Sequence, residues 1–317
     1  LYLSHCCIHL SHNFFKGVLM SSKDQLILDT LFRDIVKFYS SSQTSLVTLD
    51  AIIESINDLE CDDEMFAPQL KEVCSIITNS QPRMFPIDNL IILFEKELEN
   101  NDYFKDKDLT TKKSGTIEII KNLIKRLEHD MSELAKQGLE HIEDGDFIVL
   151  HAVEEPVELL IPEAKKMGKE FEVLILRQES VKTEQVVNVM EKNQIKYTVI
   201  PEWDLIHFFD KVNKLFIGAY AITTDGKFVS DSGTSNIVSE CHVHQLPIYL
   251  FAPVLEITPT FSRDQNIYLK EESETAGGVD FTLISHSSDI VSLDLVDHII
   301  TDQGEVNPEN LAEHCTV

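Results

Sequence analysis

The first half of the chain carries apolar residues at helical spacing. Positions three and four apart are apolar in successive groups, namely Leu28, Leu31, Ile35 and Phe38, then Ile52, Ile56 and Leu59, then Leu70, Val73, Ile76 and Ile77. Pro86 and Asp88 mark the start of a further helix. After a charged connector at 100–113, a long helix is expected, with apolar residues from Ile117 to Leu134 on one side. Residues 23–142 are therefore predicted to form a helical N-terminal domain.

Beyond Asp146 the spacing becomes typical of buried strands. The apolar runs are short and nearly continuous: FIVLH, FEVLIL, KYTVI, KLFIGAY, PIYLFAP, DFTLI and DHIIT. Helical segments at 157–166 and 183–192 separate some of them. This alternation predicts a mainly parallel sheet covered on both faces, so residues 143–317 are assigned to a Rossmann-like α/β domain. Ligands of such folds bind at the carboxyl ends of the strands.

The stretch 217–253 has a more specific order of elements. A strand ending at Gly218-Ala219 leads into a hairpin, because Asp225-Gly226 supplies the positive φ angles of a tight turn. Gly233-Thr234 then begins a helix that runs to about Gln245, and the Thr234 hydroxyl is expected to accept an N–H of its first turn. Pro247 opens the next strand.

This order resembles one family: the alpha, beta and delta regulatory subunits of translation initiation factor 2B, with the related isomerases of ribose 1,5-bisphosphate and methylthioribose 1-phosphate. In that family a glycine-alanine-aspartate strand end, a DG or NG hairpin, a glycine-threonine helix start and a proline-led strand follow one another in the same way. The similarity runs from about Ile142 to Pro308. The resemblance implies the fold described above.

Composition narrows the classes of partner. The chain has 317 residues, 43% of them apolar, which is sufficient for a large core, and its formal net charge is −27. That charge repels a phosphate backbone, so no direct nucleic-acid binding is expected, and it favours basic protein partners, although a merely soluble acidic surface explains it equally well. Neither a GxGxxG turn after a strand nor a P-loop is present, and no cofactor is expected.

The cysteines and histidines do not suggest a metal site, and the apolar runs do not suggest a membrane-spanning segment. The six cysteines form no CxxC pair and are interpreted as reduced thiols of a cytoplasmic protein. His242 and His244 lie two apart and would point in different directions on a helix, so surface roles are favoured over a metal site. No apolar run reaches the roughly 18 residues that cross a bilayer. The chain begins at Leu1 without a secretory pattern, and residues 1–22 are expected to be a poorly ordered extension.

Three strand ends differ from those of the isomerases. The enzymes place a cysteine directly after a histidine, where this chain has His151-Ala152. Their phosphate-anchoring arginine falls on Glu179, although Arg177 could compensate if the register slips by two. Their aspartate after glycine-alanine is Tyr220. Because alanine cannot titrate and a tyrosine with a pKa of about 10 is a poor base at neutral pH, no catalytic residue is assigned and Tyr220 is expected to be a packing residue.

The glycine-threonine pair of this remnant cleft is retained, at Gly233 and Thr234. Its ordinary role is a tight entry and a helix cap, and the alternative is a weak anion site at an uncovered helix start. Ser230, Asp231 and Ser232 stand where the enzymes have asparagine and lysine, which disfavours a sugar phosphate.

The segment after PIYLFAP resembles the beta subunit, with Val254 to Phe261 matching its short apolar stretch, Thr-Pro and phenylalanine. The 270–278 insertion, KEESETAGG, is expected to be a mobile loop. By resemblance the chain is a non-catalytic regulatory subunit of the guanine-nucleotide exchange factor for translation initiation factor 2, partnered by delta-type, alpha-type and catalytic subunits in a hetero-oligomer. An exposed apolar face for such pairing is expected just before KLFIGAY, at Trp203, Leu205, Ile206, Phe208 and Phe209.

Two other functions stay open from the sequence. One is a working sugar-phosphate isomerase that uses Tyr220 and Arg177 in unusual roles. The other is a homodimeric scaffold of the same fold with no part in translation.

Overall fold

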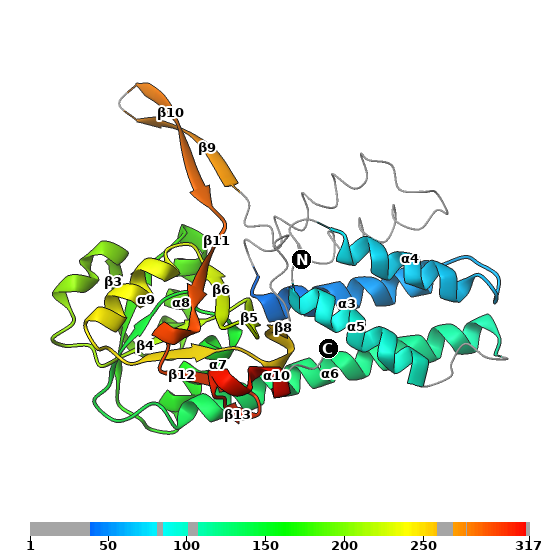
Figure 1. Ribbon diagram of the computed structural model, residues 1–317, viewed down its shortest axis with the longest axis horizontal. Helices are drawn as coiled ribbons and strands as arrows, with labels where there is room; N and C mark the ends of the chain where they lie inside the picture. The colour runs from blue at the N-terminus through cyan, green and yellow to red at the C-terminus, as the bar shows by residue number, and fades with distance from the viewer. Residues whose placement is uncertain (1–38, 81–84, 101–106, 259–268, 277, 315–317) are drawn as a thin grey trace. The chain divides into compact units, whose positions relative to one another are not determined.

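The computed structural model describes residues 39–80, 85–100, 107–258, 269–276 and 278–314. The chain divides into two compact units, and the boundary falls between His129 and Asp130, inside one helix (Figure 1). The limits expected from the sequence, 23–142 and 143–317, follow the change of element type at the end of that helix and stay a prediction. The expected disorder of residues 1–22 and the helix expected around Leu28 to Phe38 lie outside the described residues.

The first unit is helical, as its apolar spacing predicts. Its elements are α3 (Ser41–Asp58), α4 (Phe66–Thr78), α5 (Phe85–Asn100) and the first two thirds of α6 (Leu109–Leu139). α3 begins with a capping box: Ser40 Oγ accepts from the Gln43 amide at 3.1 Å, and Gln43 Oε1 accepts from the Ser40 amide at 3.4 Å. α5 packs on both α3 and α4, and the predicted stripe residues Ile52 and Ile56 are fully buried.

The charged connector predicted at 100–113 is shorter than expected. α6 already begins at Leu109, because the Asp108 carboxylate accepts the Thr111 amide at 2.8 Å and caps the helix. Lys113 then donates to the Leu59 carbonyl at 2.6 Å and Lys112 to the Asp63 carbonyl at 2.9 Å. The lysines that suggested a linker therefore belong to α6 and connect it to the segment that follows α3.

The second unit is built on a seven-stranded sheet with the order β13-β12-β7-β4-β1-β2-β3. All neighbours are parallel except β13. The strands are β1 (Phe147–Leu150), β2 (Glu172–Arg177), β3 (Lys196–Pro201), β4 (Lys214–Gly218), β7 (Ile248–Phe251), β12 (His298–Thr301) and β13 (Gly304–Glu305). The chain proceeds from β1 outward to β3 and then returns to β4 on the other side of β1. The strand order therefore reverses between β1 and β4, and the Rossmann-like architecture predicted from the sequence is confirmed.

Each face of this sheet has its own core. On one face the sheet packs against α7 (Glu155–Lys166), α8 (Ser180–Lys192) and the end of α6, through Leu160, Ile161, Met190 and Leu134. On the other face it packs against α9 (Thr234–Val243), the 3-10 helix η1 (Glu202–His207) and a second sheet, through Ile237, Leu205, Ile222 and Phe228. Successive strand residues alternate between the two cores, as in Ile148 and Val149.

The second sheet has the order β11-β6-β5-β8. Its strands are β5 (Ala221–Thr223), β6 (Lys227–Asp231), β8 (Ile257–Thr258) and β11 (Ser288–Ser292). β5 and β6 form the hairpin predicted at Asp225-Gly226, and the φ angle of Gly226 is 84°. Short helices complete the unit: η2 (Val254–Glu256), η3 (Leu293–Leu295), η4 (Pro308–Asn310) and α10 (Leu311–His314).

Two predictions on the segment before β11 are wrong. KEESETAGG was expected to be a mobile loop, yet Leu269–Ala276 is strand β9, and DFTLI was expected in the parallel sheet, yet Val279–His286 is β10, antiparallel to β9 (Figure 1). A short apolar run does not distinguish a buried parallel strand from one strand of a hairpin. Here Phe281, Leu283 and Ile284 remain 43%, 46% and 59% exposed.

None of the helices in the described ranges is both long enough and apolar enough to cross a bilayer.

Gly138 on α6 offers a test of the packing in the second unit. A Cβ at this position would lie 2.7 Å from Leu160 Cδ2 and 2.9 Å from Phe251 Cε1, both fully buried. Such overpacking costs about 1–3 kcal/mol, whereas alanine improves helix propensity by about 1 kcal/mol. The difference is about 0–2 kcal/mol, so we expect Gly138→Ala to lower the free energy of unfolding by about 1 kcal/mol in urea denaturation. Ser132→Ala, at an exposed position of the same helix, is the control. A Gly138→Ala protein as stable as the parent would contradict the close approach.

Candidate functional site

The carboxyl ends of β1 and β4 meet where the strand order reverses. His151 and Ala152 follow β1, and Gly218 ends β4. The Gly218 amide donates to the Ala152 carbonyl at 2.9 Å, and a Cβ on Gly218 would lie 2.6 Å from Glu154 Cβ. Only glycine allows the chain leaving β1 to pass so close to the end of β4. The end of β4 and the predicted cleft residue Ala152 are thus in direct contact.

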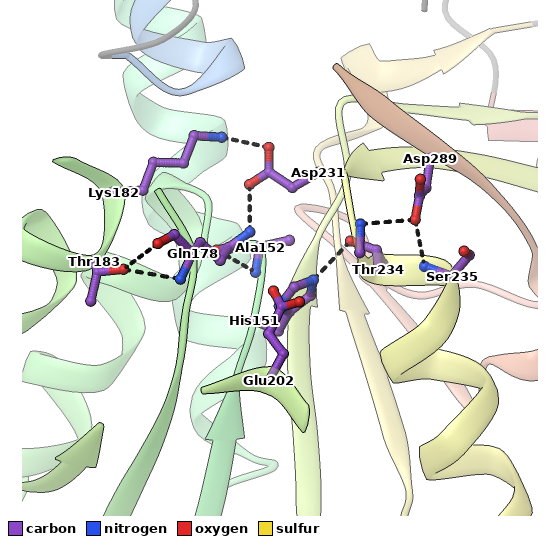
Figure 2. A network of polar contacts seen from close by, with 11 residues as sticks. His151, Ala152, Gln178, Lys182, Thr183, Glu202, Asp231, Thr234, Ser235 and Asp289 are labelled. Atoms are coloured by element: carbon purple, nitrogen blue, oxygen red, sulfur yellow. Dashed lines mark hydrogen bonds and ion pairs between the residues drawn. The ribbon is translucent and has the colours of Figure 1, made fainter. Parts of the chain in front are cut away.

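Ala152 is held in an unusual backbone conformation by a neighbouring strand end. Its φ angle is 47°, in the left-handed region that costs a residue with a side chain roughly 1–2 kcal/mol. Its amide donates to Gln178 Oε1 at 3.1 Å, and the Gln178 amide donates to Thr183 Oγ1 at 3.0 Å (Figure 2). The position that holds a cysteine in the isomerases therefore contributes main-chain contacts and no titratable group.

A buried ion pair forms the centre of the site. Lys182, in the first turn of α8, donates to Asp231 Oδ1 at 2.5 Å, and Gln178 Nε2 donates to Asp231 Oδ2 at 3.1 Å (Figure 2). The Lys182 ammonium also lies 2.9 Å from the Tyr220 hydroxyl, which donates to Asp231. The two charged side chains are only 24% and 11% exposed.

The charges of this pair are mutually stabilised. Burial alone would raise the pKa of Asp231, but the Lys182 charge and the hydrogen bonds from Lys182 and Tyr220 outweigh it and lower that pKa. Burial alone would lower the pKa of Lys182, and the Asp231 charge reverses this to a raised pKa. Burial and the same carboxylate raise the pKa of Tyr220 well above its usual value. The tyrosine therefore stays protonated and is a poor base.

His151 is fully buried and faces two polar groups. Its Nε2 lies 3.1 Å from Thr234 Oγ1, and its Nδ1 lies 3.5 Å from Glu202 Oε1, beyond ordinary hydrogen-bond length (Figure 2). Burial lowers the pKa of His151 to about 4, so the ring is neutral at physiological pH. Burial, followed by the Asp231 and Asp289 charges, raises the pKa of Glu202.

The expected capping role of Thr234 is wrong. Gly233 is the N-cap residue of α9, and the Thr234 hydroxyl contacts His151 rather than an amide of the first turn. The Asp289 carboxylate of β11 accepts from the Gly233 amide at 3.0 Å and from the Ser235 amide at 2.9 Å. A carboxylate of the chain itself thus occupies this helix start, which is not the uncovered anion site considered from the sequence.

The two charged residues predicted at the end of β2 are exposed. Arg177 is the last residue of β2 and is exposed, and Glu179 is the exposed N-cap residue of α8. Glu179 adds negative potential at Lys182 and Tyr220. Among the described residues, the cation paired with Asp231 is Lys182, which no sequence motif indicates.

The residues of the predicted apolar face do not all lie on the same side of η1. A 3-10 helix has three residues per turn, so Trp203 and Ile206 share one side, and Glu202 and Leu205 share another. Trp203 is 76% and Ile206 46% exposed, whereas Leu205 is fully buried in the core and is excluded from any exposed face. Phe208 and Phe209 are partly buried against the same core, and the Phe209 ring stacks on His244 at 4.0 Å.

The described residues contain neither a candidate metal site nor a reactive thiol. Across these ranges no three His, Cys, Asp or Glu side chains gather closely enough to hold a metal ion, and His242 and His244 are exposed. Cys61, Cys74 and Cys241 are free thiols. Burial raises the pKa of Cys74 and Cys241 to about 12, so both are unreactive.

Comparison with known proteins gives one consistent family. The family model described as "Initiation factor 2 subunit family" matches residues 37–308. A Pyrococcus horikoshii protein named as eIF-2B subunit 2-like is 27% identical over 251 residues, 78% of this chain and 85% of the relative. Translation initiation factor eIF2B subunit beta of Dictyostelium discoideum is 27% identical over 207 residues, 62% and 53% of the two chains. Ribose 1,5-bisphosphate isomerase of Pyrococcus furiosus is 22% identical over 256 residues, 76% and 77%.

Solved structures show the same fold. The P. horikoshii OT3 translation initiation factor eIF-2B aligns with a TM-score of 0.73 at 22% identity, covering 90% of this chain and 98% of the other. A chain of the tetrameric eIF2B-beta2-delta2 complex from C. thermophilum aligns with a TM-score of 0.69 at 15% identity, covering 93% and 96%.

The buried His151 predicts a specific loss of stability in acid. Its pKa falls from an ordinary 6.5 to about 4 on folding, so the unfolded chain binds the proton more tightly in that interval. As the pH falls from 6.5 to 4, this residue alone should remove up to about 3 kcal/mol from the free energy of unfolding. Replacing it removes this component, so the stabilities of the parent and His151→Gln should converge over the interval in urea denaturation. His244→Gln, at an exposed histidine, is the control for replacing a histidine. Parallel profiles for the parent and His151→Gln would contradict the neutral buried ring.

Proposed function

The chain belongs to the initiation factor 2 subunit family, and on that basis we propose that it is a non-catalytic regulatory subunit in the guanine-nucleotide exchange factor complex for translation initiation factor 2. The proposal includes the beta type, a cytoplasmic location, and delta-type, alpha-type and catalytic subunits as partners, with translation initiation factor 2 as the regulated substrate. The family's isomerase members provide the alternative that must be excluded.

The absence of an acid–base pair at the strand ends carries the proposal. An aldose–ketose isomerase removes a proton from one carbon and delivers one to its neighbour, which requires titratable groups with suitable pKa values. Ala152 has none, and the raised pKa of Tyr220 keeps its hydroxyl protonated beside Asp231. Asp231 is neutralised by Lys182, which leaves neither group available as a free base.

The retained histidine does not restore the chemistry. His151 is fully buried, and its Nε2 is engaged with Thr234. With a pKa of about 4 it is a weak base at neutral pH. The charge of the site also disfavours a sugar phosphate, because the Asp289 carboxylate already occupies the start of α9, while Arg177 is exposed at the end of β2.

The proposed subunit type and partners are supported by similarity to eIF2B subunits in sequence and in fold. The segment from Val254 resembles the beta subunit, and a relative of that name is among the similar proteins. The solved relative with a TM-score of 0.69 belongs to a beta2-delta2 tetramer, which supports a hetero-oligomer here. Trp203 and Ile206, which are exposed side by side on η1, are the proposed docking residues. Large exposed aromatics are the side chains that most often anchor interfaces.

The first test separates a regulatory subunit from an enzyme. The purified chain incubated with ribose 1,5-bisphosphate or methylthioribose 1-phosphate should form no ketose product above the background rate, because Ala152 and Tyr220 supply no acid–base pair at the described strand ends. An active isomerase of the family, assayed in parallel, is the positive control. Turnover above background by the purified chain would refute the non-catalytic assignment.

The second test separates the regulatory subunit from an unrelated scaffold. Affinity capture should recover delta-type and catalytic exchange-factor subunits, and their absence would remove the regulatory role. Trp203→Ala should weaken assembly with the delta-type subunit at least about tenfold, since truncating an aromatic anchor costs 2 kcal/mol or more. Met167→Ala, which removes another exposed apolar side chain of the second unit, is the matched control and should bind like the parent. Equal affinity for all three proteins would place the interface elsewhere.

A further inference from the structure

The β9–β10 hairpin forms a sheet of its own. Among the described strands, β9 and β10 are hydrogen-bonded only to each other. A two-stranded hairpin is at best marginally stable in water, and it needs a third strand or a packed face to be stable independently. Every residue of β10 from Val279 to Ile284 is exposed, so the described part of the protein does not supply that packed face.

One face of β10 is apolar. Successive residues of a strand point to opposite faces, so Val279, Phe281 and Leu283 lie on the same face. They are 64%, 43% and 46% exposed. We refer to these three residues as the apolar row.

The opposite face is acidic. Asp280 lies on this face, together with Thr282 and Ile284. The register places Glu271 of β9 directly opposite Ile284, and residues directly opposite each other share a face. Asp280 and Glu271 are both exposed. The hairpin therefore presents apolar side chains on one face and carboxylates on the other.

β10 also has an open edge. It pairs with β9 on one side, and no described strand is hydrogen-bonded to its other side. Exposed apolar edge strands pair readily with other chains, and proteins usually block such pairing with lysine or proline. The β10 sequence, VDFTLISH, contains neither residue. The edge is therefore chemically suited to accept another strand.

Charge selects the kind of strand that fits. A second copy of the chain would bring its own Glu271 and Asp280 to a face that is already acidic, and like charges destabilise strand pairing. The same carboxylates repel nucleic acids and anionic lipids. A strand with lysine or arginine on one face and apolar residues on the other is complementary to both faces of the hairpin.

We propose that β10 binds an extended, basic segment of a partner protein by strand addition. Apolar residues of that segment alternate with lysine or arginine, so that the apolar side chains cover the apolar row and the cations lie on the face of Asp280 and Glu271. In strand addition, main-chain hydrogen bonds provide affinity and the alternating side chains provide specificity. The inference does not depend on the proposed regulatory role, and either can fail alone.

A synthetic strand with this pattern tests the proposal. The peptide VKVKVKVK, with both ends blocked, should cause a saturable shift of the β10 backbone amide signals in NMR spectra of the full chain. VEVEVEVE has the same alternation with the opposite charge, and KKVVKKVV has the same composition without the alternation. Neither should shift those signals at equal concentration. A response that is absent, or that either control peptide reproduces, would overturn the proposal.

Removal of the apolar row assigns the response to β10. The double variant Phe281→Thr/Leu283→Thr keeps residues that favour strands and should bind VKVKVKVK at least about tenfold more weakly. Val199→Thr removes an apolar side chain that is 38% exposed on the edge strand β3, and it should bind like the parent. Undiminished binding by the double variant would contradict the assigned surface.

Charge reversal separates specific pairing from attraction to an acidic protein. Glu271→Lys/Asp280→Lys should prefer VEVEVEVE to VKVKVKVK, although the chain as a whole stays acidic because its formal net charge is −27. Glu118→Lys/Glu184→Lys, at two exposed acids outside the hairpin, should keep the parent's preference. If the hairpin variant still prefers VKVKVKVK, the peptide responds to overall charge and the proposal is wrong.

Self-association is the other occupant to exclude. Sedimentation of the full chain and of Phe281→Thr/Leu283→Thr should show the same oligomeric state for both proteins. An oligomer of the parent that this double variant dissociates would assign β10 to a second copy of the chain and overturn the proposal.

Discussion

The arrangement of the strand ends depends on one buried ion pair. Lys182 on α8 and Asp231 on β6 join a helix covering the large sheet to the smaller sheet, and Gln178 extends the pair to the Ala152 amide. Buried charges are tolerated only when paired and hydrogen-bonded, and both conditions hold here. The lowered pKa of Asp231 makes its contribution to stability fully present above the ordinary aspartate pKa. The raised pKa of Lys182 makes its own present below the ordinary lysine pKa, so the pair persists across the neutral range.

Most helices and strands could be predicted from neighbouring residues in the sequence. The contacts at the centre of the site could not, because they join residues far apart in the sequence. Helices follow from apolar spacing, and the β5–β6 hairpin follows from Asp225-Gly226, because these signals lie within a few residues. Lys182 contacts Asp231 from 49 positions away, and Gln178 does so from 53. In the sequence Lys182 is one more polar residue near a helix start, so nothing distinguishes it from a lysine in solvent. Only the three-dimensional course of the chain gives it a role.

The wrong expectations share one cause: a local signal compatible with two outcomes. The Thr234 hydroxyl could cap a helix or contact a distant group, and His151, 83 positions earlier, takes it while Asp289 supplies the cap. Leu205 was grouped with exposed aromatics, but the three-residue turn of η1 directs it into the core. The isomerase comparison, in contrast, located three strand ends correctly: His151 follows β1, Arg177 ends β2 and Gly218 ends β4.

The division of the chain within α6 constrains how this protein can change. Leu123 lies on the part of the helix that belongs to the first unit, and Leu134 lies in the core of the second. Removing one residue between them would rotate one buried stripe about 100° around the helix axis relative to the other. An insertion or deletion between these positions therefore changes the direction in which one stripe faces relative to the other, except near multiples of seven residues, which return the register. Because one continuous helix carries buried residues of both units, a cut at the boundary would break a helix that each unit uses.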